Sequence, residues 1–364
     1  MLILGIDTSC DDTCAAILEI RNSKLEILSN IMSSQVKLHA KYGGVYPILA
    51  KREHQRNLAP VLKKALQGAR LLNSKIKNQK LKIDVIGVTV GPGLEPCLWQ
   101  GVNFAKKLSE DLKLQIIPVN HIEAHVCANF LKVKNKCDRI HISPNKGLFP
   151  AVCLVVSGGH TQLILMKDIG KYKLIGETRD DAAGECFDKA ARILGLGYPG
   201  GPAISRYAAQ WKSEIRNPKS EIKLPRPMIY QKNYDFSFSG LKTAVLYDFR
   251  RRSPKVRKSK KYIQEMCREV QQAITDVLIH KTFKAAKDFR AKSIILGGGV
   301  ASNDELRKQF KEKIQKEIPN TRYLIPDTKF CTDNAAMVAI TAFFHKKEKF
   351  DLPQIKADAN LKIC

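Results

Sequence analysis

The strongest constraint on the fold of this chain is an order of three strands followed by alternating helices and strands, which occurs twice. Alternating and β-branched apolar runs predict the strands, and helical apolar periodicity predicts the helices. In the first half, strands are predicted at 2–7, 15–20, 25–32, 84–90 and 116–119, and helices at 52–71 and 99–112. After Pro150, strands are predicted at 151–156, 162–166, 173–177, 293–296 and 323–325, with a helix at 304–315. Two similar α/β units predict two lobes with a central cleft.

Size and charge limit what the chain can be. Its 364 residues, 44% of them hydrophobic, suffice for two domains with separate cores. The formal net charge of +27 at pH 7 indicates a nucleic-acid partner, an acidic membrane surface, or a proteome rich in Lys. The basic run at 250–261 is a candidate RNA contact, and a solvated basic loop is the alternative.

The cysteines and the N-terminus indicate a cytoplasmic protein. Ten cysteines are scattered over a long chain, which favours reduced thiols over a secreted disulfide framework. The first residues run from an apolar stretch directly into acidic side chains, so they do not resemble a signal peptide. No apolar run has the length of a membrane span, and we expect no membrane partner.

His121 and His125 follow a predicted strand in the sequence HIEAH. On a helix, side chains four residues apart share a face, so two imidazoles can bind one metal ion. A polar surface stripe is the alternative. The motif is not HExxH, which leaves a zinc peptidase without its general base. Asp333 is a possible third ligand, although the sequence does not show that the fold brings it to the histidines.

Two glycine-containing turns are candidate phosphate contacts. The turn from Ser157 to Thr161 joins two predicted strands, and its paired glycines allow backbone amides to approach an anion. The acidic turn after Asp7 occupies the matching place in the first half. Residues 297–303, GGGVASN, connect a strand to a helix that Ser302 or Asn303 can cap. An ordinary hairpin and an ordinary strand-to-helix turn are the alternatives.

Two further segments place acidic residues near helix starts. Carboxylates at 180–188 precede or begin a helix, where they favour the positive end of its dipole. Asp188 is expected near the loop at 198–202, where it could accept hydrogen bonds from hydroxyl groups. Thr332 or Asp333 is the expected N-cap of a late helix.

The motifs together resemble the tRNA N6-adenosine threonylcarbamoyltransferase family, in its bacterial type. They are IDTSCDD, YGGVYPILAKREH, GPG, HIEAH, VSGGHTQL, DDAAGECFDKAARILGLGYPGGP, FSFSGLKTAV, GGGVASN and CTDNAAMVA, and they run nearly from end to end. The resemblance implies an α/β, duplicated ribonuclease H-like fold of the actin and sugar-kinase kind. We expect a first lobe at 1–119 with 326–364, and a second lobe at 120–325 that carries HIEAH and SGGHT.

The resemblance also implies the site. One divalent metal, iron or alternatively zinc, would be bound by His121, His125 and Asp333. Asp7 would lie near the reacting end, as base or water-orienting group. The adenylate would be bound by Val155, Val156, Ser157, Gly158, Gly159, Asp188, Gly201 and Asn303. Ser205 departs from the family pattern, because many members carry a ligand-contacting Asp there, so it is left out of the site.

The implied reaction transfers a threonylcarbamoyl group from threonylcarbamoyl-AMP to N6 of the adenosine beside the anticodon, in tRNAs that read codons beginning with A. AMP leaves, and no covalent enzyme intermediate is needed. The implied partners are tRNA, a degenerate paralogue that dimerises with the first lobe, and a small P-loop ATPase. A sugar-kinase-like phosphotransferase and a non-catalytic basic nucleic-acid scaffold are the rival functions. Two imidazoles are unnecessary for such a kinase, which binds magnesium through oxygen ligands.

Overall fold

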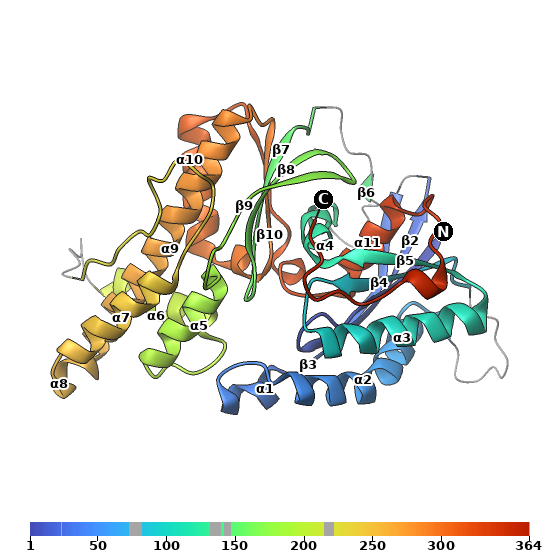
Figure 1. The fold of residues 1–364 in the computed structure, drawn as a ribbon, viewed down its shortest axis with the longest axis horizontal. Helices are drawn as coiled ribbons and strands as arrows, with labels where there is room; N and C mark the ends of the chain where they lie inside the picture. The colour runs from blue at the N-terminus through green and yellow to red at the C-terminus, as the bar shows by residue number, and fades with distance from the viewer. Residues whose placement is uncertain (23, 73–81, 132–139, 142–146, 215–221, 364) are drawn as a thin grey trace. The chain divides into compact units, whose positions relative to one another are not determined.

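The computed structural model describes residues 1–22, 24–72, 82–131, 140–141, 147–214 and 222–363 (Figure 1). The chain divides into two compact units. Unit 1 comprises Met1–Lys146, Ile169–Lys171 and Pro326–Cys364, and unit 2 comprises Gly147–Asp168 and Tyr172–Ile325. No helix among the described residues is long and apolar enough to cross a membrane.

Unit 1 is built on a six-stranded sheet with the order β5-β4-β1-β2-β3-β6. The strands are β1 (Leu2–Asp7), β2 (Asp12–Arg21), β3 (Lys24–Ser34), β4 (Val85–Gly91), β5 (Gln115–Asn120) and β6 (Ile140–His141). β1 pairs antiparallel with β2 and parallel with β4, and β4 pairs parallel with β5. Asp7 at the end of β1 and Asn120 at the end of β5 therefore lie at the carboxyl edge of the parallel strands.

Helices cover both faces of this sheet. The helices of unit 1 include α1 (Val36–His39), the 3-10 helix η1 (Ala40–Tyr42), α2 (Pro47–Gly68), α3 (Glu95–Leu112), α4 (His121–Cys127) and α11 (Ala335–Phe344). Successive residues of β1 belong to opposite cores: Ile3 lies in the cluster that contains Met337 of α11, whereas Leu4 lies in the cluster that contains Leu58 of α2. A Cβ on Gly5 would lie 2.1 Å from the Ala335 carbonyl oxygen, so glycine lets α11 approach β1 closely.

The observed division differs from the predicted lobe boundary at residue 119. Residues 120–146 belong to unit 1, because α4 directly follows β5 and packs against α11. The HIEAH helix therefore shares a unit with Asp7 and Asp333. Helix α2 also begins five residues before the predicted start at 52, because Pro47 favours the first position of a helix.

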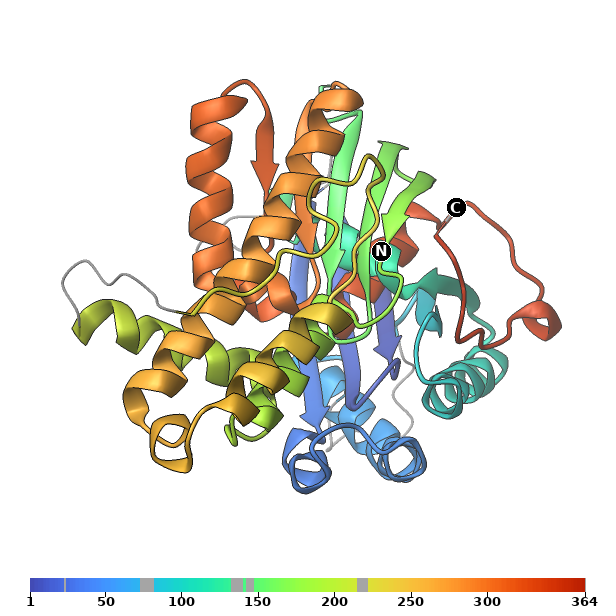
Figure 2. The same cartoon turned by 60° about the vertical axis from the view of Figure 1, so that its left-hand side comes forward.

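Unit 2 contains a five-stranded sheet with the order β11-β10-β7-β8-β9. The strands are β7 (Ala151–Val156), β8 (Thr161–Asp168), β9 (Lys171–Glu177), β10 (Ser293–Gly297) and β11 (Arg322–Leu324). Its helices are α5 (Ala183–Ile193), α6 (Gly200–Glu214), α7 (Ser239–Arg251), α8 (Pro254–Arg257), α9 (Lys260–Asp288) and α10 (Asp304–Glu317), with the 3-10 turn η3 (Gly299–Ser302). The repeated three-strand opening predicted from the sequence is confirmed in both units. Figure 2 shows the long helix α9, in orange, beside α10.

Candidate metal centre and phosphate turn

His121 and His125 are brought together by a short, capped helix. The Asn120 side-chain oxygen accepts hydrogen bonds from the amides of Ile122 at 2.9 Å and Glu123 at 3.2 Å, which fixes the start of α4 at His121. One helical turn then places the two imidazole ring centroids 4.6 Å apart. Both side chains are buried, which argues against a polar surface stripe.

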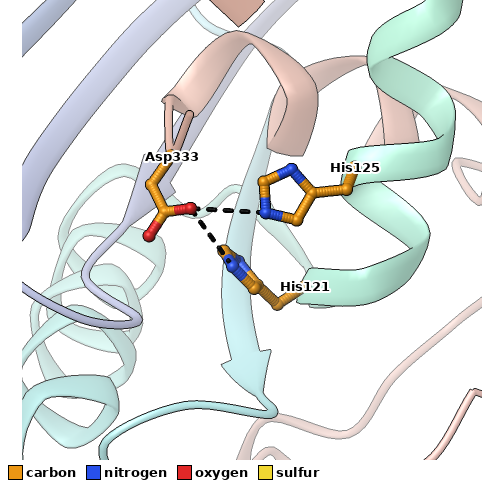
Figure 3. Close-up of side chains that lie close together, drawn as sticks. All are labelled: His121, His125 and Asp333. Atoms are coloured by element: carbon orange, nitrogen blue, oxygen red, sulfur yellow. Dashed lines mark ion pairs between the residues drawn. The ribbon is translucent and has the colours of Figure 1, made fainter. Parts of the chain in front are cut away.

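Asp333 meets both histidines from the residues that precede α11. Its Oδ1 lies 3.4 Å from Nε2 of His121 and 3.3 Å from Nε2 of His125 (Figure 3). The prediction that Thr332 or Asp333 caps this helix is wrong, because Asn334 is the N-cap and accepts from the Met337 amide at 3.0 Å. The carboxylate of Asp333 is therefore left to face the histidines.

The three side chains fit a single metal ion. Ligand atoms of His121, His125 and Asp333 all lie within 4.8 Å of one another. A tetrahedral site with metal–ligand bonds of about 2.1 Å has ligand atoms about 3.4 Å apart, close to the two nitrogen–oxygen distances observed. The imidazole Nδ1 atoms of both histidines are buried and make no hydrogen bond within the described part of the chain. Neutral imidazoles with an acidic oxygen suit iron or zinc equally, so the donor set does not fix the metal.

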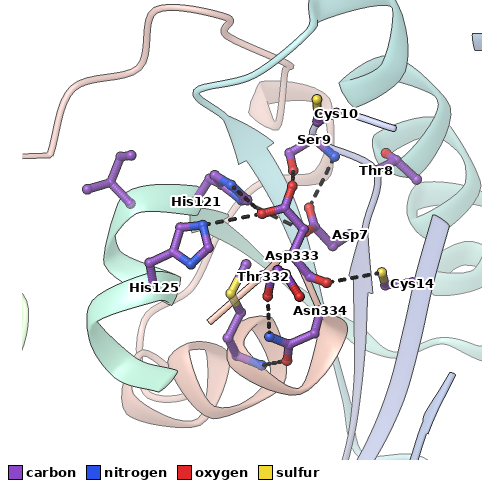
Figure 4. Close-up of polar contacts among 12 residues, drawn as sticks. Asp7, Thr8, Ser9, Cys10, Cys14, His121, His125, Thr332, Asp333 and Asn334 are labelled. Carbon is purple, nitrogen blue, oxygen red and sulfur yellow. Dashed lines mark hydrogen bonds and ion pairs between the residues drawn. The ribbon is translucent and has the colours of Figure 1, made fainter. Parts of the chain in front are cut away.

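Asp7 and Ser9 border this centre at the end of β1 (Figure 4). Oδ1 of Asp7 accepts a hydrogen bond from the Ser9 amide at 3.2 Å, and the Ser9 hydroxyl donates to Oδ2 of Asp333 at 3.4 Å. Oδ2 of Asp7 lies 3.8 Å from Nδ1 of His121 and is buried without a hydrogen bond among the described residues. Asp7 thus faces the side of His121 opposite the Asp333 contact.

Burial and charge act against each other at this cluster. Burial lowers the pKa of His121, but the charges of Asp333 and Asp7 outweigh it and raise the pKa to about 9. Burial raises the pKa of Asp7. For Asp333, burial is outweighed by His121 and His125, which hold its pKa well below the ordinary range. His125 has a lowered pKa because it is fully buried. Asp333 is therefore anionic and His125 neutral, the forms that bind a metal, whereas His121 is protonated below about pH 9 and would have to release that proton to bind one.

A further pair of side chains, which no sequence pattern indicates, joins the elements that carry the three candidate ligands. Glu123 of α4 accepts a hydrogen bond from Nε2 of His345 at 2.8 Å, and His345 follows α11. The two residues are 222 positions apart in the chain, so spacing cannot reveal their contact. This pair joins α4 to α11 at the end of α11 away from Asp333.

In unit 2, the candidate phosphate turn has glycines that the fold itself does not require. Gly158 and Gly159 are exposed, neither has a positive φ, and a Cβ on either would meet no atom within 4 Å. The Ser157 amide closes the hairpin by donating to the His160 carbonyl at 2.8 Å. Space for a ligand beside the turn, not strain within it, is therefore consistent with the two glycines.

Neighbouring segments of unit 2 pack closely around this turn. A Cβ on Gly184, at the start of α5, would lie 2.4 Å from the Ser157 carbonyl oxygen. Gly298 has a φ of +88°, and a Cβ there would lie 2.3 Å from the Val156 carbonyl oxygen. The end of β7, which carries Val155 and Val156, therefore lies against both the first turn of α5 and the segment leading to Asn303.

The remaining predicted residues make defined contacts in unit 2. Oδ1 of Asp188 accepts from the Gly200 amide at 2.6 Å, as expected from its predicted place near the 198–202 loop, and Gly201 follows in α6. Asn303 caps α10 through the Leu306 amide at 3.0 Å and donates to Gln271 at 2.8 Å. Burial raises the pKa of Asp188, whereas the amides of Gly200 and Gly201 oppose that rise.

The expectation that carboxylates near residue 180 serve their own helix is wrong for Asp180. The N-cap residue Ala182 offers no side-chain hydrogen bond to α5, and the Ala183 amide instead donates to the Thr161 hydroxyl at 2.9 Å. Asp180 instead accepts hydrogen bonds from the Phe238 amide at 2.8 Å and the Ser239 amide at 3.2 Å, at the start of α7. A carboxylate cap can come from a distant segment of the chain, which a local pattern does not reveal.

Comparisons with known proteins agree with this arrangement. The structure of T. kodakarensis HypF matches with a TM-score of 0.58 at 14% identity, over 95% of this chain and 47% of that chain. Full-length HypF in its phosphate- and nucleotide-bound form matches with a TM-score of 0.53 at 12% identity, over 95% and 56%. These likenesses concern the fold alone, and with the two sheets they confirm the predicted duplicated ribonuclease H-like fold.

The sequence comparisons identify the family. The family model described as tRNA N6-adenosine threonylcarbamoyltransferase matches residues 26–340. The protein of that name from Thermosipho africanus is 44% identical over 364 residues, covering 100% of both chains. The one from Syntrophomonas wolfei is 44% identical over 344 residues, covering 94% of this chain and 92% of the relative. The chain therefore belongs to the tRNA N6-adenosine threonylcarbamoyltransferase family.

Proposed function

We propose how this chain carries out the reaction of its family, the transfer of a threonylcarbamoyl group to N6 of a tRNA adenosine. The proposed donor is threonylcarbamoyl-AMP, and the proposed acceptor is the adenosine beside the anticodon in tRNAs that read codons beginning with A. The amino nitrogen attacks the carbamoyl carbon, a C–N bond forms, the bond from that carbon to the phosphate oxygen breaks, and AMP leaves. The buried cluster of His121, His125 and Asp333 is the observation that carries the proposal. Membership of the family decides against the kinase and scaffold alternatives.

We assign metal binding to that cluster. His121 and His125 would offer Nε2 and Asp333 would offer Oδ1, the atoms that already face one another. A bound divalent ion, iron or zinc, would act as a Lewis acid that polarises an oxygen of the donor. The side chains contribute orientation, since the Asn120 cap and the Asn334 cap fix the elements that hold them.

Asp7 is proposed to act close to the reacting end. Its buried Oδ2 faces His121, which supports a role in orienting that imidazole, as carboxylates commonly do for metal-bound histidines. The same atom could instead receive the proton released from the attacking amino group, because burial raises the pKa of Asp7. Replacement by Asn separates these roles, because an amide can orient an imidazole but cannot take up the proton.

The turn of unit 2 is proposed to hold the adenylate. Gly158 and Gly159 are exposed, and their amides form no hydrogen bond within the described chain, so they can donate to a phosphate oxygen and stabilise AMP as it departs. Val155, Val156 and Ser157 position that turn. Asp188 is proposed to accept hydrogen bonds from ligand hydroxyls, with Gly201 and Asn303 beside the ligand.

A degenerate paralogue and a small P-loop ATPase are proposed as protein partners, and the cytoplasm as the location. Unit 1 supports a partner surface because four large apolar side chains of β3, η1 and the α2 segment are more than half exposed: Met32, Tyr42, Tyr46 and Ile48. The Tyr42 and Tyr46 rings stack with centroids 5.8 Å apart. Exposed aromatic groups of this kind mark protein interfaces. Ile48→Asp is expected to abolish co-elution with the paralogue, whereas Lys63→Asp, at an exposed position of the same helix, is the control and should leave co-elution unchanged.

Nucleoside mass spectrometry tests the proposed reaction. Unmodified tRNA is incubated with threonylcarbamoyl-AMP, the purified chain and its two proposed partners, and the nucleosides are then released and analysed. Wild type is expected to form threonylcarbamoyladenosine and His121→Ala is expected to form none. Equal product with the variant would remove the metal assignment, and no product with wild type and competent partners would remove the proposed donor.

A further inference from the structure

A surface pocket in unit 2 combines an anchored backbone segment, an exposed aromatic ring and several cationic side chains. Its volume is about 520 Å³, and it lies between the segment before residue 226 and helix α7. We name it the α7 pocket, and its lining includes Lys223, Leu224, Tyr247, Asp248, Arg250 and Arg251. None of these residues belongs to the metal cluster or to the candidate phosphate turn. Figures 1 and 2 show α7 and α8 beside the first turns of α9.

The backbone that carries Lys223 is held on both sides by buried carboxylates of α9. The Ile222 amide donates to Glu265 at 3.1 Å, and the Leu224 amide donates to Glu269 at 3.2 Å. Arg226 then binds Asp276 at 2.9 Å and also pairs with Glu269. Lys223 is exposed between these two anchors, so its position at the pocket edge is fixed by the fold.

Arg250 and Arg251 remain available for an anionic ligand. Both are exposed and form no ion pair with any described residue. The acid in the lining, Asp248, is occupied, because it pairs with Arg252 at 3.2 Å and accepts from the Tyr262 hydroxyl at 2.9 Å. The helix dipole favours cations in the last turn of α7, but it does not explain why Lys223 from another segment joins them. The pocket therefore gathers three cations around one anchored acid.

The segment from the end of α7 to the start of α9, which borders the pocket, is also strongly basic. Residues 247–261 contain eight Lys or Arg and one Asp, which is a net charge of +7 over 15 residues. Arg252 and Arg257 lie over the rings of Tyr262 and Phe249, at 5.8 Å and 5.3 Å from the centroids. Tyr247 differs from these rings, because it is 59% exposed and no described cation covers it. An exposed ring among unpaired cations is the combination that binds a base together with its phosphate.

We propose that the α7 pocket binds tRNA, with phosphates held by Lys223, Arg250 and Arg251 and an unstacked base placed against Tyr247. The choice of tRNA rests on the proposed function, while the pocket itself rests on the contacts above. A nucleotide fits a concave site of this volume and uses both the ring and the charges. An acidic peptide would use the charges alone, and a lipid surface would favour a flat face over a pocket.

Fluorescence anisotropy of labelled unmodified tRNA with the full chain tests this proposal over a range of KCl concentrations. Arg250→Ala with Arg251→Ala should weaken binding about tenfold at 0.1 M salt and reduce the slope of log affinity against log salt by about 1.5. Tyr247→Ala should weaken binding about tenfold without changing that slope, and Tyr247→Phe should restore it. Lys311→Ala with Lys316→Ala removes the same charge from exposed positions of α10 and should change affinity less than about twofold.

The proposal is overturned if the two double variants behave alike, because the overall charge would then account for binding. It is also overturned if the arginine variant binds tRNA normally but loses binding to an acidic peptide or to phosphatidylserine vesicles. In the modification assay, the arginine variant should raise KM for tRNA and keep kcat at saturating tRNA. Failure of the proposed reaction is distinguishable, since wild type would then form no product while the binding difference between the variants remained.

Discussion

The contact between His345 and Glu123 should stabilise unit 1 in a pH-dependent way. His345 donates to Glu123 at 2.8 Å and pairs with Glu348 at 2.6 Å, and its own side chain is only 16% exposed. These contacts, led by Glu123 and opposed by burial, raise the pKa of His345 from 6.5 to about 9. A rise of about 2.5 pH units corresponds to roughly 3 kcal/mol of stability. Glu348 is 54% exposed and should contribute little, so most of this stabilisation comes from the contact with Glu123.

The pH dependence of this stabilisation follows from the rise in the pKa of His345. Because the folded state binds the proton more tightly, the stabilisation is complete below pH 6.5 and is lost as the pH rises through about 9. His345→Gln should therefore lower the free energy of unfolding by about 2–3 kcal/mol at pH 6 and by well under 1 kcal/mol at pH 9.5. Glu348→Gln should change it by less than about 1 kcal/mol at either pH.

Urea unfolding, monitored by tryptophan fluorescence, measures the change in the free energy of unfolding of unit 1 at each pH. Unit 1 contains Trp99 and unit 2 contains Trp211, and the chain has two tryptophans in all. In a Trp211→Phe background the signal reports unit 1 alone. The cycle of His345→Gln with Glu123→Gln gives the coupling directly. If the loss were the same at pH 6 and pH 9.5, the ion pair would not be its cause.

Three further predictions follow from single contacts. Asn334→Ala should destabilise unit 1 by about 1 kcal/mol, measured by the same unfolding assay, because α11 loses its N-cap, and Thr332→Ala should cost less. Gly298→Ala should destabilise unit 2 by more than about 2 kcal/mol in thermal unfolding, because φ is +88° and the added Cβ would meet Val156. Gly158→Ala, the matched control for stability, should leave the unfolding temperature unchanged. It should instead weaken the binding of a non-hydrolysable adenylate, measured by calorimetry. If the Asp7 carboxylate takes up a proton, Asp7→Asn should lower kcat at least tenfold in the nucleoside assay while the metal content stays near that of wild type. An unchanged kcat would exclude that role.

The fold could be predicted because its signals are local. The strands of both openings are short apolar runs separated by turns, and β1, β7 and their neighbours appear where those runs occur. The pair of histidines was also predictable, since four residues on a helix place them on one face. The central cleft between the lobes stays a prediction.

What the sequence could not supply are contacts between distant segments. Asp333 meets the histidines only because Asn334 takes the capping position, and several nearby residues could have served as the cap equally well. Asp180 caps α7 from a different segment, and Glu123 meets His345 across 222 residues. The lobe boundary differed for a related reason, because α4 packs on α11, which lies near the end of the chain. Tertiary packing decides each of these contacts, and periodicity does not encode it.

A metal-titrated single turnover tests the central claim most directly. Chelator-treated protein is reconstituted with increasing amounts of Fe²⁺ or Zn²⁺, and the threonylcarbamoyladenosine formed in tRNA is measured against bound metal. We predict that product rises in proportion to bound metal and saturates at one ion per chain, and that Asp333→Ala neither retains metal nor forms product. Full product from the metal-free protein, or from Asp333→Ala without bound metal, would contradict the account.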